Sequence, residues 1–212
     1  MEVLQALSDS LQKGDVKNVA ALTGQAIQQG LEPKTILDRG LIAGMTIVGE
    51  QFKSHEIFLP DVLLAAKAMY AGMDLLKPLL IRDGIQTIGK VVIGTVQGDL
   101  HDIGKNLVAI MLKGAGFEVI DLGNDVSPQN FIDTAEKMQA DVIGMSALLT
   151  TTMPVMKKVV DLARERQLYG KLKIIVGGAP LSSEYAKEIG AHQYCFDGMS
   201  AVECVKKFVG RN

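Results

Sequence analysis

The first part of the chain, up to about residue 83, carries apolar residues at helical spacing and contains no run that predicts a strand. Glycine, aspartate and proline mark the ends of its amphipathic stretches. One helix is predicted to end near Gly14, a second to run from Asp15 to Gly30, a third to begin at Pro33 and a fourth at Pro60. Four helices with short connections predict a small antiparallel bundle.

From Lys90 the pattern changes to short apolar runs that alternate with amphipathic segments. The runs predict strands over residues 91–96, 118–122, 142–147, 173–176 and 194–196. Between and after them, helices are predicted over 103–113, 128–138, 154–166, 183–189 and 200–209. This alternation predicts a five-stranded parallel sheet of the flavodoxin- or Rossmann-like, doubly wound α/β type. The predicted domains are 1–84 for the bundle and 90–212 for the α/β part, with 85–89 as a linker.

Composition narrows the possible functions. The net charge is −2 and no basic run stands out, so a nucleic-acid surface is not expected. No apolar stretch is long enough for a membrane span, and the N-terminus lacks the features of a signal peptide. The two cysteines have no CxxC spacing and form no metal-binding pattern. We therefore expect a cytoplasmic protein that binds neither nucleic acid nor membrane.

The candidate chemistry lies in the loop after the first predicted strand. This loop places Asp99, His101, Asp102 and Gly104 within a few positions, in a chain with only three histidines. Ligands of such sheets bind beyond the carboxyl ends of the strands, near the switch point. A histidine can bind a metal through one ring nitrogen while the other donates a hydrogen bond, and Asp99 is the candidate acceptor. Gly104 would let a bulky ligand approach closely.

A single histidine is too few for a metal site built from protein alone. The other two, His55 and His192, show no pairing with it and are predicted to lie at the surface. One axial ligand is enough only when a macrocycle supplies the other donors, so the loop favours a tetrapyrrole-like cofactor. Two further clusters follow later strands and are expected at the same sheet edge: Ser146, Leu148, Thr150, Thr151 and Thr152 after the third, and Gly177 with Gly178 after the fourth.

Together these motifs, DxHxxG, SxL and GG in this order and spacing, resemble the cobalamin-binding modules of the methionine-synthase and methyltransferase type. The resemblance covers nearly the whole chain. It is strongest to the free-standing corrinoid proteins of anaerobic methyltransferase systems that use methanol, methylamines or methoxylated compounds. It implies cobalamin or a related corrinoid bound base-off and His-on, with His101 as the cobalt ligand and Asp99 as the hydrogen-bond partner that tunes it.

The resemblance also implies roles for other residues. Asp102, Ile103 and Gly104 complete the cofactor-binding loop. The residues implied to line or make room for the nucleotide tail are Ser146, Leu148, Thr150, Thr152, Gly177 and Gly178. Thr152 stands where the family often has serine. In the bundle, the stretches 44–52 and 58–60 resemble the helical cap over the reactive cobalt face, with Phe52 and Leu59 shielding the bound methyl group.

The implied function is that of a methyl carrier, a shuttle subunit rather than a complete enzyme. The cobalt accepts a methyl group from a donor-specific methyltransferase, and a second methyltransferase passes it to a thiol or to a pterin such as tetrahydrofolate. A protein that reductively reactivates the cobalt is a further implied partner. The glycine-bounded segment from Asp83 to Gly89 is the expected hinge for cap movement.

Two alternatives stay open. A cobalamin-based sensor would use the same fold, but no basic segment supplies a DNA-binding output. A flavodoxin-like electron carrier or response-regulator receiver would share the strand order. A receiver needs an aspartate at the end of its third strand, where this chain has Ser146 and Ala147.

Overall fold

The computed structural model describes residues 2–84 and 87–210. The chain forms two compact units. One contains the described residues up to Thr87 together with Gly114–Gly116, and the other contains Ile88–Lys113 and the residues from Phe117 onward. Of the predicted linker, residues 85 and 86 lie outside the described residues, so the linker and its role as a hinge stay predictions, as do the domain limits.

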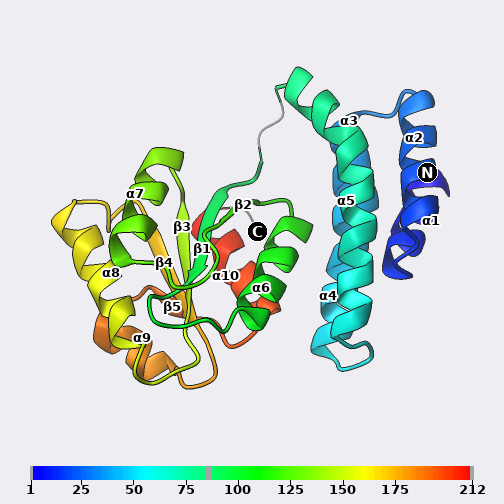
Figure 1. Ribbon diagram of the computed structural model, residues 1–212. Helices are drawn as coiled ribbons and strands as arrows, with labels where there is room; N and C mark the ends of the chain where they lie inside the picture. Colours follow the sequence, from blue (N-terminus) through cyan, green and yellow to red (C-terminus); the bar gives the residue numbers. More distant parts are fainter. Residues whose placement is uncertain (1, 85–86, 211–212) are drawn as a thin grey trace. The chain divides into compact units, whose positions relative to one another are not determined.

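The first unit is built from helices, as predicted (Figure 1). They are α1 (Glu2–Gln12), α2 (Val16–Gln28), α3 (Pro33–Ile36), η1 (Leu37–Ile42), α4 (Ala43–Lys53) and α5 (Leu59–Arg82). Asp15 caps α2 by accepting a hydrogen bond from the Asn18 N–H at 3.0 Å. Fully buried leucines and valines form the core, among them Leu7, Leu11, Val19, Leu41, Val48 and Leu76.

The third predicted helix differs from expectation in one respect. It consists of α3, η1 and α4 without a break, and η1 is a π-helical turn. Gly40 lies in this turn, where an added Cβ would come within 2.6 Å of Leu7 Cδ2. The glycine therefore allows η1 to pack closely against α1. A π turn leaves the apolar spacing nearly helical, which is why the sequence pattern does not reveal it.

The second unit is a five-stranded sheet with every strand parallel to its neighbours. The strands are β1 (Lys90–Thr95), β2 (Glu118–Asp121), β3 (Val142–Ser146), β4 (Lys173–Gly177) and β5 (Gln193–Tyr194). Their order in the sheet is β2-β1-β3-β4-β5. β1, β3 and β4 are buried over most of their length, because helices cover both faces of a parallel sheet.

The covering helices are α6 (Ile103–Gly114), α7 (Pro128–Met138), α8 (Pro154–Glu165), α9 (Ser183–Ile189) and α10 (Gly198–Phe208). Helices α7, α8 and α9 lie on one side of the sheet, and α6 and α10 lie on the other (Figure 1). Phe131, Met156 and Ala186 bring α7, α8 and α9 into one buried cluster with the strands. The predicted fold class is confirmed.

The strand order decides where a ligand can bind. The chain passes from β1 to β2 on one side and then returns to β3 on the other, so the order reverses between β1 and β3. In doubly wound sheets, ligands bind beyond the carboxyl ends of the strands at such a switch point. Residues 96–102 and 147–153 are the loops that follow β1 and β3.

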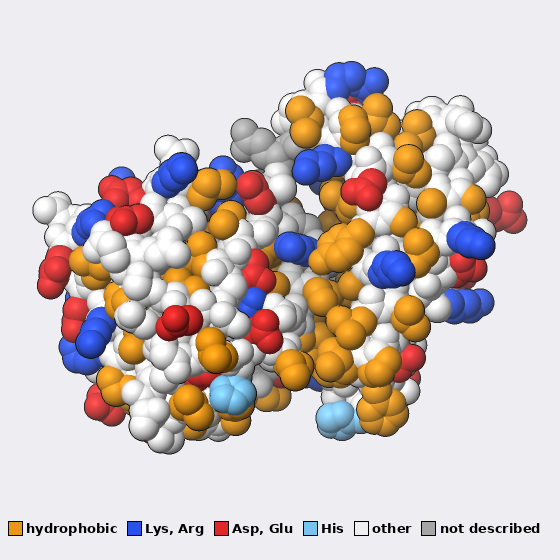
Figure 2. Space-filling model, in the orientation of Figure 1, with side chains coloured by type: hydrophobic (Ala, Val, Ile, Leu, Met, Phe, Trp, Pro, Cys, Tyr) orange, Lys and Arg blue, Asp and Glu red, His pale blue; other side chains and the backbone are white. Residues whose placement is uncertain are grey.

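Neither acidic nor basic side chains dominate the face of the molecule shown in Figure 2. The two kinds intermingle there, in keeping with the net charge of −2. Within residues 2–84 and 87–210, no helix is long and apolar enough to cross a membrane.

Candidate cofactor site at the carboxyl edge of the sheet

A tight turn follows β1 at the carboxyl edge of the sheet. The Asp99 N–H donates to the Val96 carbonyl at 3.1 Å, which closes a β-turn over Val96–Asp99. Gly98 occupies its third position with φ +86°, a left-handed conformation that glycine adopts without strain. The turn places Asp99 in the interior, where its side chain is fully buried.

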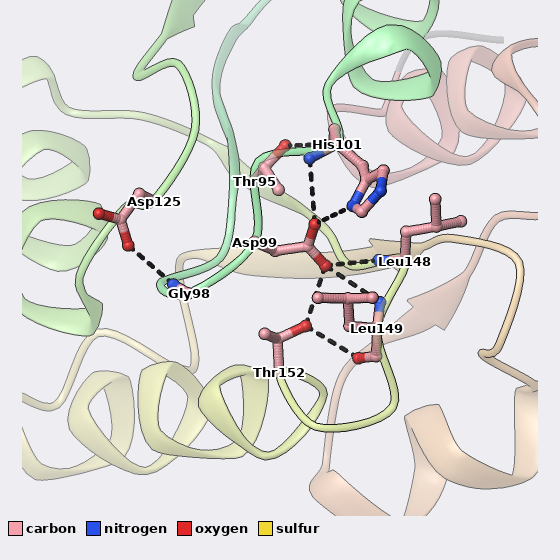
Figure 3. Close-up of polar contacts among 8 residues, drawn as sticks. All are labelled: Thr95, Gly98, Asp99, His101, Asp125, Leu148, Leu149 and Thr152. Carbon is pink, nitrogen blue, oxygen red and sulfur yellow. Dashed lines mark hydrogen bonds and ion pairs between the residues drawn. The ribbon is translucent and has the colours of Figure 1, made fainter.

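The Asp99 carboxylate joins the two loops that meet at the switch point (Figure 3). Its Oδ1 accepts from the His101 N–H at 3.0 Å and lies 2.8 Å from His101 Nδ1. Its Oδ2 accepts from the Leu148 N–H at 2.8 Å and from the Leu149 N–H at 3.1 Å. Thr152 Oγ1 lies 2.9 Å from the same oxygen. A buried carboxylate with this many donors is held in one orientation.

These donors also set the ionisation of Asp99. Burial alone would raise the pKa of the carboxyl group, since it disfavours the charged form. The hydrogen bonds from Leu148, His101 and Leu149 stabilise the carboxylate and outweigh burial, so the pKa of Asp99 lies well below its ordinary value. Asp99 is therefore ionised at neutral pH and acts as an acceptor only.

The ionised Asp99 fixes how His101 is presented. Because a carboxylate can only accept, Nδ1 of His101 carries the proton in their 2.8 Å contact. In the neutral imidazole this leaves Nε2 with a free lone pair, on a side chain that is 51% exposed. Thr95 Oγ1 donates to the His101 carbonyl at 3.0 Å and holds the backbone of the same residue. An imidazole held in this way presents Nε2 in a fixed direction, as a metal-binding histidine requires.

The surroundings fit a large flat group better than a bare ion. Among the described residues no set of three or more His, Cys, Asp or Glu side chains is arranged to hold a metal. Apolar side chains are exposed around the loop instead: Leu100 is 69% exposed, Ile103 72% and Leu148 43%. A Cβ added at Gly104 would meet no atom within 4 Å, so the fold itself does not require glycine there. The donor set thus suits a metal that brings its own equatorial ligands.

The residues predicted for the tail pocket in and after β3 differ in burial. Ser146 ends β3, and Thr150 lies exposed in the following turn. Thr152 is buried, and its Oγ1 is 2.8 Å from the Leu149 carbonyl as well as 2.9 Å from Asp99 Oδ2. Its single proton serves one acceptor at a time. The threonine hydroxyl thus lies within hydrogen-bonding distance of the Asp99 carboxylate.

The two glycines after β4 have a packing role of their own. A Cβ on Gly178 would lie 1.9 Å from the Ala147 carbonyl oxygen, and its φ is +137°. A Cβ on Gly177 would lie 2.9 Å from the Cys195 carbonyl oxygen. Both glycines are thus needed for close backbone approach within the protein. Contact with a nucleotide tail stays a prediction for both.

The remaining predicted residues lie as follows. Asp102 precedes α6, and its carbonyl accepts from the Asn106 N–H at 2.7 Å. Phe52 lies near the end of α4 and Leu59 begins α5, both partly exposed at the turn between these helices. Their shielding role stays a prediction. His55 is exposed in this turn, as expected. His192 is half-buried, and its ring packs against that of Tyr169.

Sequence reasoning missed three residues of the site. Thr95 and Leu149 reach it through the hydrogen bonds described above. The carboxylate of Asp125, from the loop after β2, accepts from the Gly98 N–H at 2.7 Å. Thr95 and Asp125 had one available signal, their positions at or just beyond the ends of predicted neighbouring strands. That signal does not distinguish them from ordinary loop residues.

Family comparisons agree with this geometry. The model of a B12 binding domain matches residues 89–205, and a second B12 binding domain model matches residues 3–77. The chain belongs to the B12-binding corrinoid proteins. A dimethylamine corrinoid protein of Methanosarcina barkeri is 44% identical over 209 residues, covering 98% of each chain. A corrinoid protein of Desulfitobacterium hafniense (strain Y51) is 40% identical over 214 residues, covering 100% of this chain and 99% of that protein.

A solved structure extends the comparison to the whole fold. The methanol:cobalamin methyltransferase complex MtaBC of Methanosarcina barkeri contains a chain that superposes with a TM-score of 0.89 and 28% identity, covering 100% of this chain and 81% of that one. This protein is therefore a cobalamin-binding corrinoid protein of the methylamine and methanol methyltransferase type. The flavodoxin-like and receiver alternatives are thereby removed.

Proposed function

We propose that this corrinoid protein carries a methyl group between two methyltransferases, with its cofactor bound base-off and His101 as the lower cobalt ligand. The observation that carries the proposal is the Asp99–His101 contact of 2.8 Å. It places the proton on Nδ1 and leaves Nε2 of a half-exposed ring available. The bound corrinoid supplies the cobalt on which a methyl group can be carried.

The chain's own residues would perform four tasks. His101 would bind the cobalt of the cofactor through Nε2, and Asp99 would keep the histidine ring oriented. Asp102, Ile103 and Gly104 form the adjoining surface, with the open space at Gly104 receiving the ring system. The loops after β3 and β4 receive the nucleotide tail through Ser146, Leu148, Thr150, Thr152, Gly177 and Gly178. The helical bundle would serve as the cap, and its residues Phe52 and Leu59 would shield the methyl group.

The proposed partners follow from the relatives. One relative is named for dimethylamine, and another is solved in a complex with a methanol:cobalamin methyltransferase. We propose a donor-specific methyltransferase as the first partner and a thiol- or pterin-dependent methyltransferase as the second. A reductive-activation protein is the third proposed partner, and the proposed location is the cytoplasm.

Electron paramagnetic resonance of the cobalt(II) form tests the ligand directly. Protein labelled with nitrogen-15 histidine is reconstituted with unlabelled cobalamin and reduced by one electron. Coordination by His101 predicts a doublet from the axial nitrogen, where unlabelled protein shows a triplet. His101→Ala should lose this splitting, and His55→Ala, at an exposed turn, should keep it. A triplet in the labelled protein, or no nitrogen splitting, would overturn the ligand assignment.

The carrier role is tested by the partners of the holoprotein in its native cells. Affinity purification after crosslinking should recover methyltransferases, and the protein without corrinoid should recover fewer. Recovery of a DNA-binding or kinase partner in their place would favour the sensor alternative and contradict methyl carriage.

A further inference from the structure

The loop that follows β2 contacts the turn that carries Asp99, and it does so through Asp125. Asp125 Oδ1 accepts from the Gly98 N–H at 2.7 Å, and the Asp125 N–H donates to the Asp99 carbonyl at 3.1 Å. Figure 3 shows the carboxylate facing Gly98 from the side opposite His101. The two hydrogen bonds therefore bracket the Gly98–Asp99 dipeptide, one at each end.

We infer that Asp125 is a positioning residue, which holds the Asp99 turn so that the Asp99 carboxylate meets Nδ1 of His101. The inference deepens the proposed function, and its consequence for the cofactor depends on His101 being the cobalt ligand. It adds a third loop to the site, because Asp125 comes from the β2 side of β1 and Leu148 from the β3 side.

The turn needs such support because of Gly98. Its φ of +86° makes glycine necessary, but a glycine peptide has many accessible conformations. The Asp99 N–H to Val96 carbonyl bond of 3.1 Å closes the turn without fixing the direction of the Gly98 N–H. A short hydrogen bond to a carboxylate is among the stronger kinds and fixes that direction.

The loop that carries Asp125 is itself held by hydrogen bonds to β1. The Thr95 N–H donates to the Gly123 carbonyl at 2.9 Å, and the Val126 N–H donates to the Thr95 carbonyl at 3.0 Å. The loop on either side of Asp125 is thus continuous with the hydrogen bonding of β1. Asp125 itself has φ +53°, and its carboxylate accepts from the Gly98 N–H in this conformation. A rigid loop can transmit its position to the Asp99 turn.

Two substitutions separate the acceptor from the backbone conformation. Asp125→Gly removes the carboxylate and tolerates the positive φ, whereas Asp125→Asn keeps an acceptor oxygen and also tolerates it. Gln139→Gly is the matched control, because Gln139 has φ +52° and ends α7 away from this turn.

The first measurement uses the protein without cofactor. Nitrogen NMR of the neutral His101 ring reports which nitrogen carries the proton. Wild type, Asp125→Asn and Gln139→Gly should all show the Nδ1–H tautomer, and Asp125→Gly should show a mixture of both tautomers. A purely structural role would lower the unfolding temperature and leave the tautomer unchanged.

The second measurement is the affinity for cobalamin, followed by absorbance. Residues that orient a metal-ligating histidine commonly change affinity by about tenfold or more, and Asp125→Gly should weaken binding by about tenfold while Asp125→Asn stays near wild type. Asp125→Gly with wild-type tautomer and affinity would overturn the inference. If Asp125→Gly does not fold, Asp125→Asn decides. A mixture of tautomers in Asp125→Asn would overturn the inference, because asparagine retains the acceptor oxygen.

The two proposals fail separately. If electron paramagnetic resonance shows no histidine ligand, the proposed function fails. A tautomer change in the cofactor-free Asp125→Gly protein would still support positioning of His101 by Asp125. If the ligand is confirmed and the tautomer does not respond to Asp125→Gly, only the positioning inference is wrong.

Discussion

The two edges of the sheet each hold one histidine, and they use it in opposite ways. At the carboxyl edge, Nδ1 of His101 donates to Asp99 at 2.8 Å and the ring is half exposed. At the amino edge, Nδ1 of His192 accepts from the Ile174 N–H at 3.0 Å. The ring of His192 lies 4.6 Å from that of Tyr169 and 6.1 Å from that of Phe208, centroid to centroid.

This difference also appears in the electrostatics. Burial lowers the pKa of His192, and the nearby charges of Lys173 and Arg164 lower it further. His192 is therefore a neutral packing residue with its proton on Nε2, while His101 offers Nε2 as a free lone pair. The ring of His192 thus contributes to packing, whereas the ring of His101 is left accessible, as the proposed cofactor contact requires. Substitutions at three positions test this distinction.

The largest effect is expected at a packed position of the carboxyl edge. Gly178→Ala would place a Cβ 1.9 Å from the Ala147 carbonyl oxygen, at φ +137°. The backbone must shift, so we expect the free energy of unfolding of the cofactor-free protein to fall by about 3 kcal/mol or more. Chemical denaturation measures this. Gly170→Ala is the control, with no atom within 4 Å of the added Cβ. Equal stabilities of the two variants would show that the clash is relieved without cost.

A smaller effect is expected at the amino edge. His192→Phe keeps a ring but leaves the Ile174 N–H without its acceptor, which costs about 1–3 kcal/mol of unfolding free energy when the group is buried. His192→Asn keeps an acceptor and no longer titrates. Denaturation of both variants and of wild type at neutral pH should give a higher unfolding free energy for His192→Asn than for His192→Phe.

The pH dependence of stability tests the same histidine. The folded pKa of His192 lies below its ordinary value of 6.5, so the unfolded chain binds the proton more readily. Wild-type stability should therefore fall as the pH drops below about 6.5 and continue to fall down to the folded pKa. The decrease should be shallower in His192→Asn. Parallel curves for the two proteins would contradict a lowered pKa.

The smallest effect on stability is expected at the open position. Gly104→Ala adds a Cβ that meets no atom within 4 Å near the start of α6. Alanine favours helix over glycine, so unfolding free energy should stay equal or rise by less than about 1 kcal/mol. Cobalamin retention on gel filtration should nevertheless decrease, because the added methyl group would occupy space that the proposed cofactor contact needs. Unchanged retention would show that Gly104 does not face the cofactor.

Much of this molecule could be predicted from local pattern. The helical spacing before residue 83 and the apolar runs after Lys90 predicted the elements of both units, because burial on one side of a helix or on both faces of a parallel strand leaves a regular sequence signature. The pair Asp99 and His101 was also predictable, since two residues of one loop contact each other at 2.8 Å. The limits of the strands agree with the structure to within one or two residues.

Contacts between distant segments could not be predicted in this way. The hydrogen bonds of Asp99 to Leu148, Leu149 and Thr152, and of Asp125 to Gly98, join residues that are far apart in the sequence. The requirement for Gly178 likewise depends on Ala147, in the loop after a neighbouring strand.

The sequence by itself thus determined the two-part architecture, the cofactor class and the candidate histidine. Only the tertiary structure decided which groups hold that histidine in place and which glycines serve packing. The physical reason is the strand order β2-β1-β3-β4-β5, which sets the loops after β2 and β3 on either side of the loop after β1. Local periodicity records whether a residue is buried, but the identity of its neighbours across the sheet depends on how the strands are arranged.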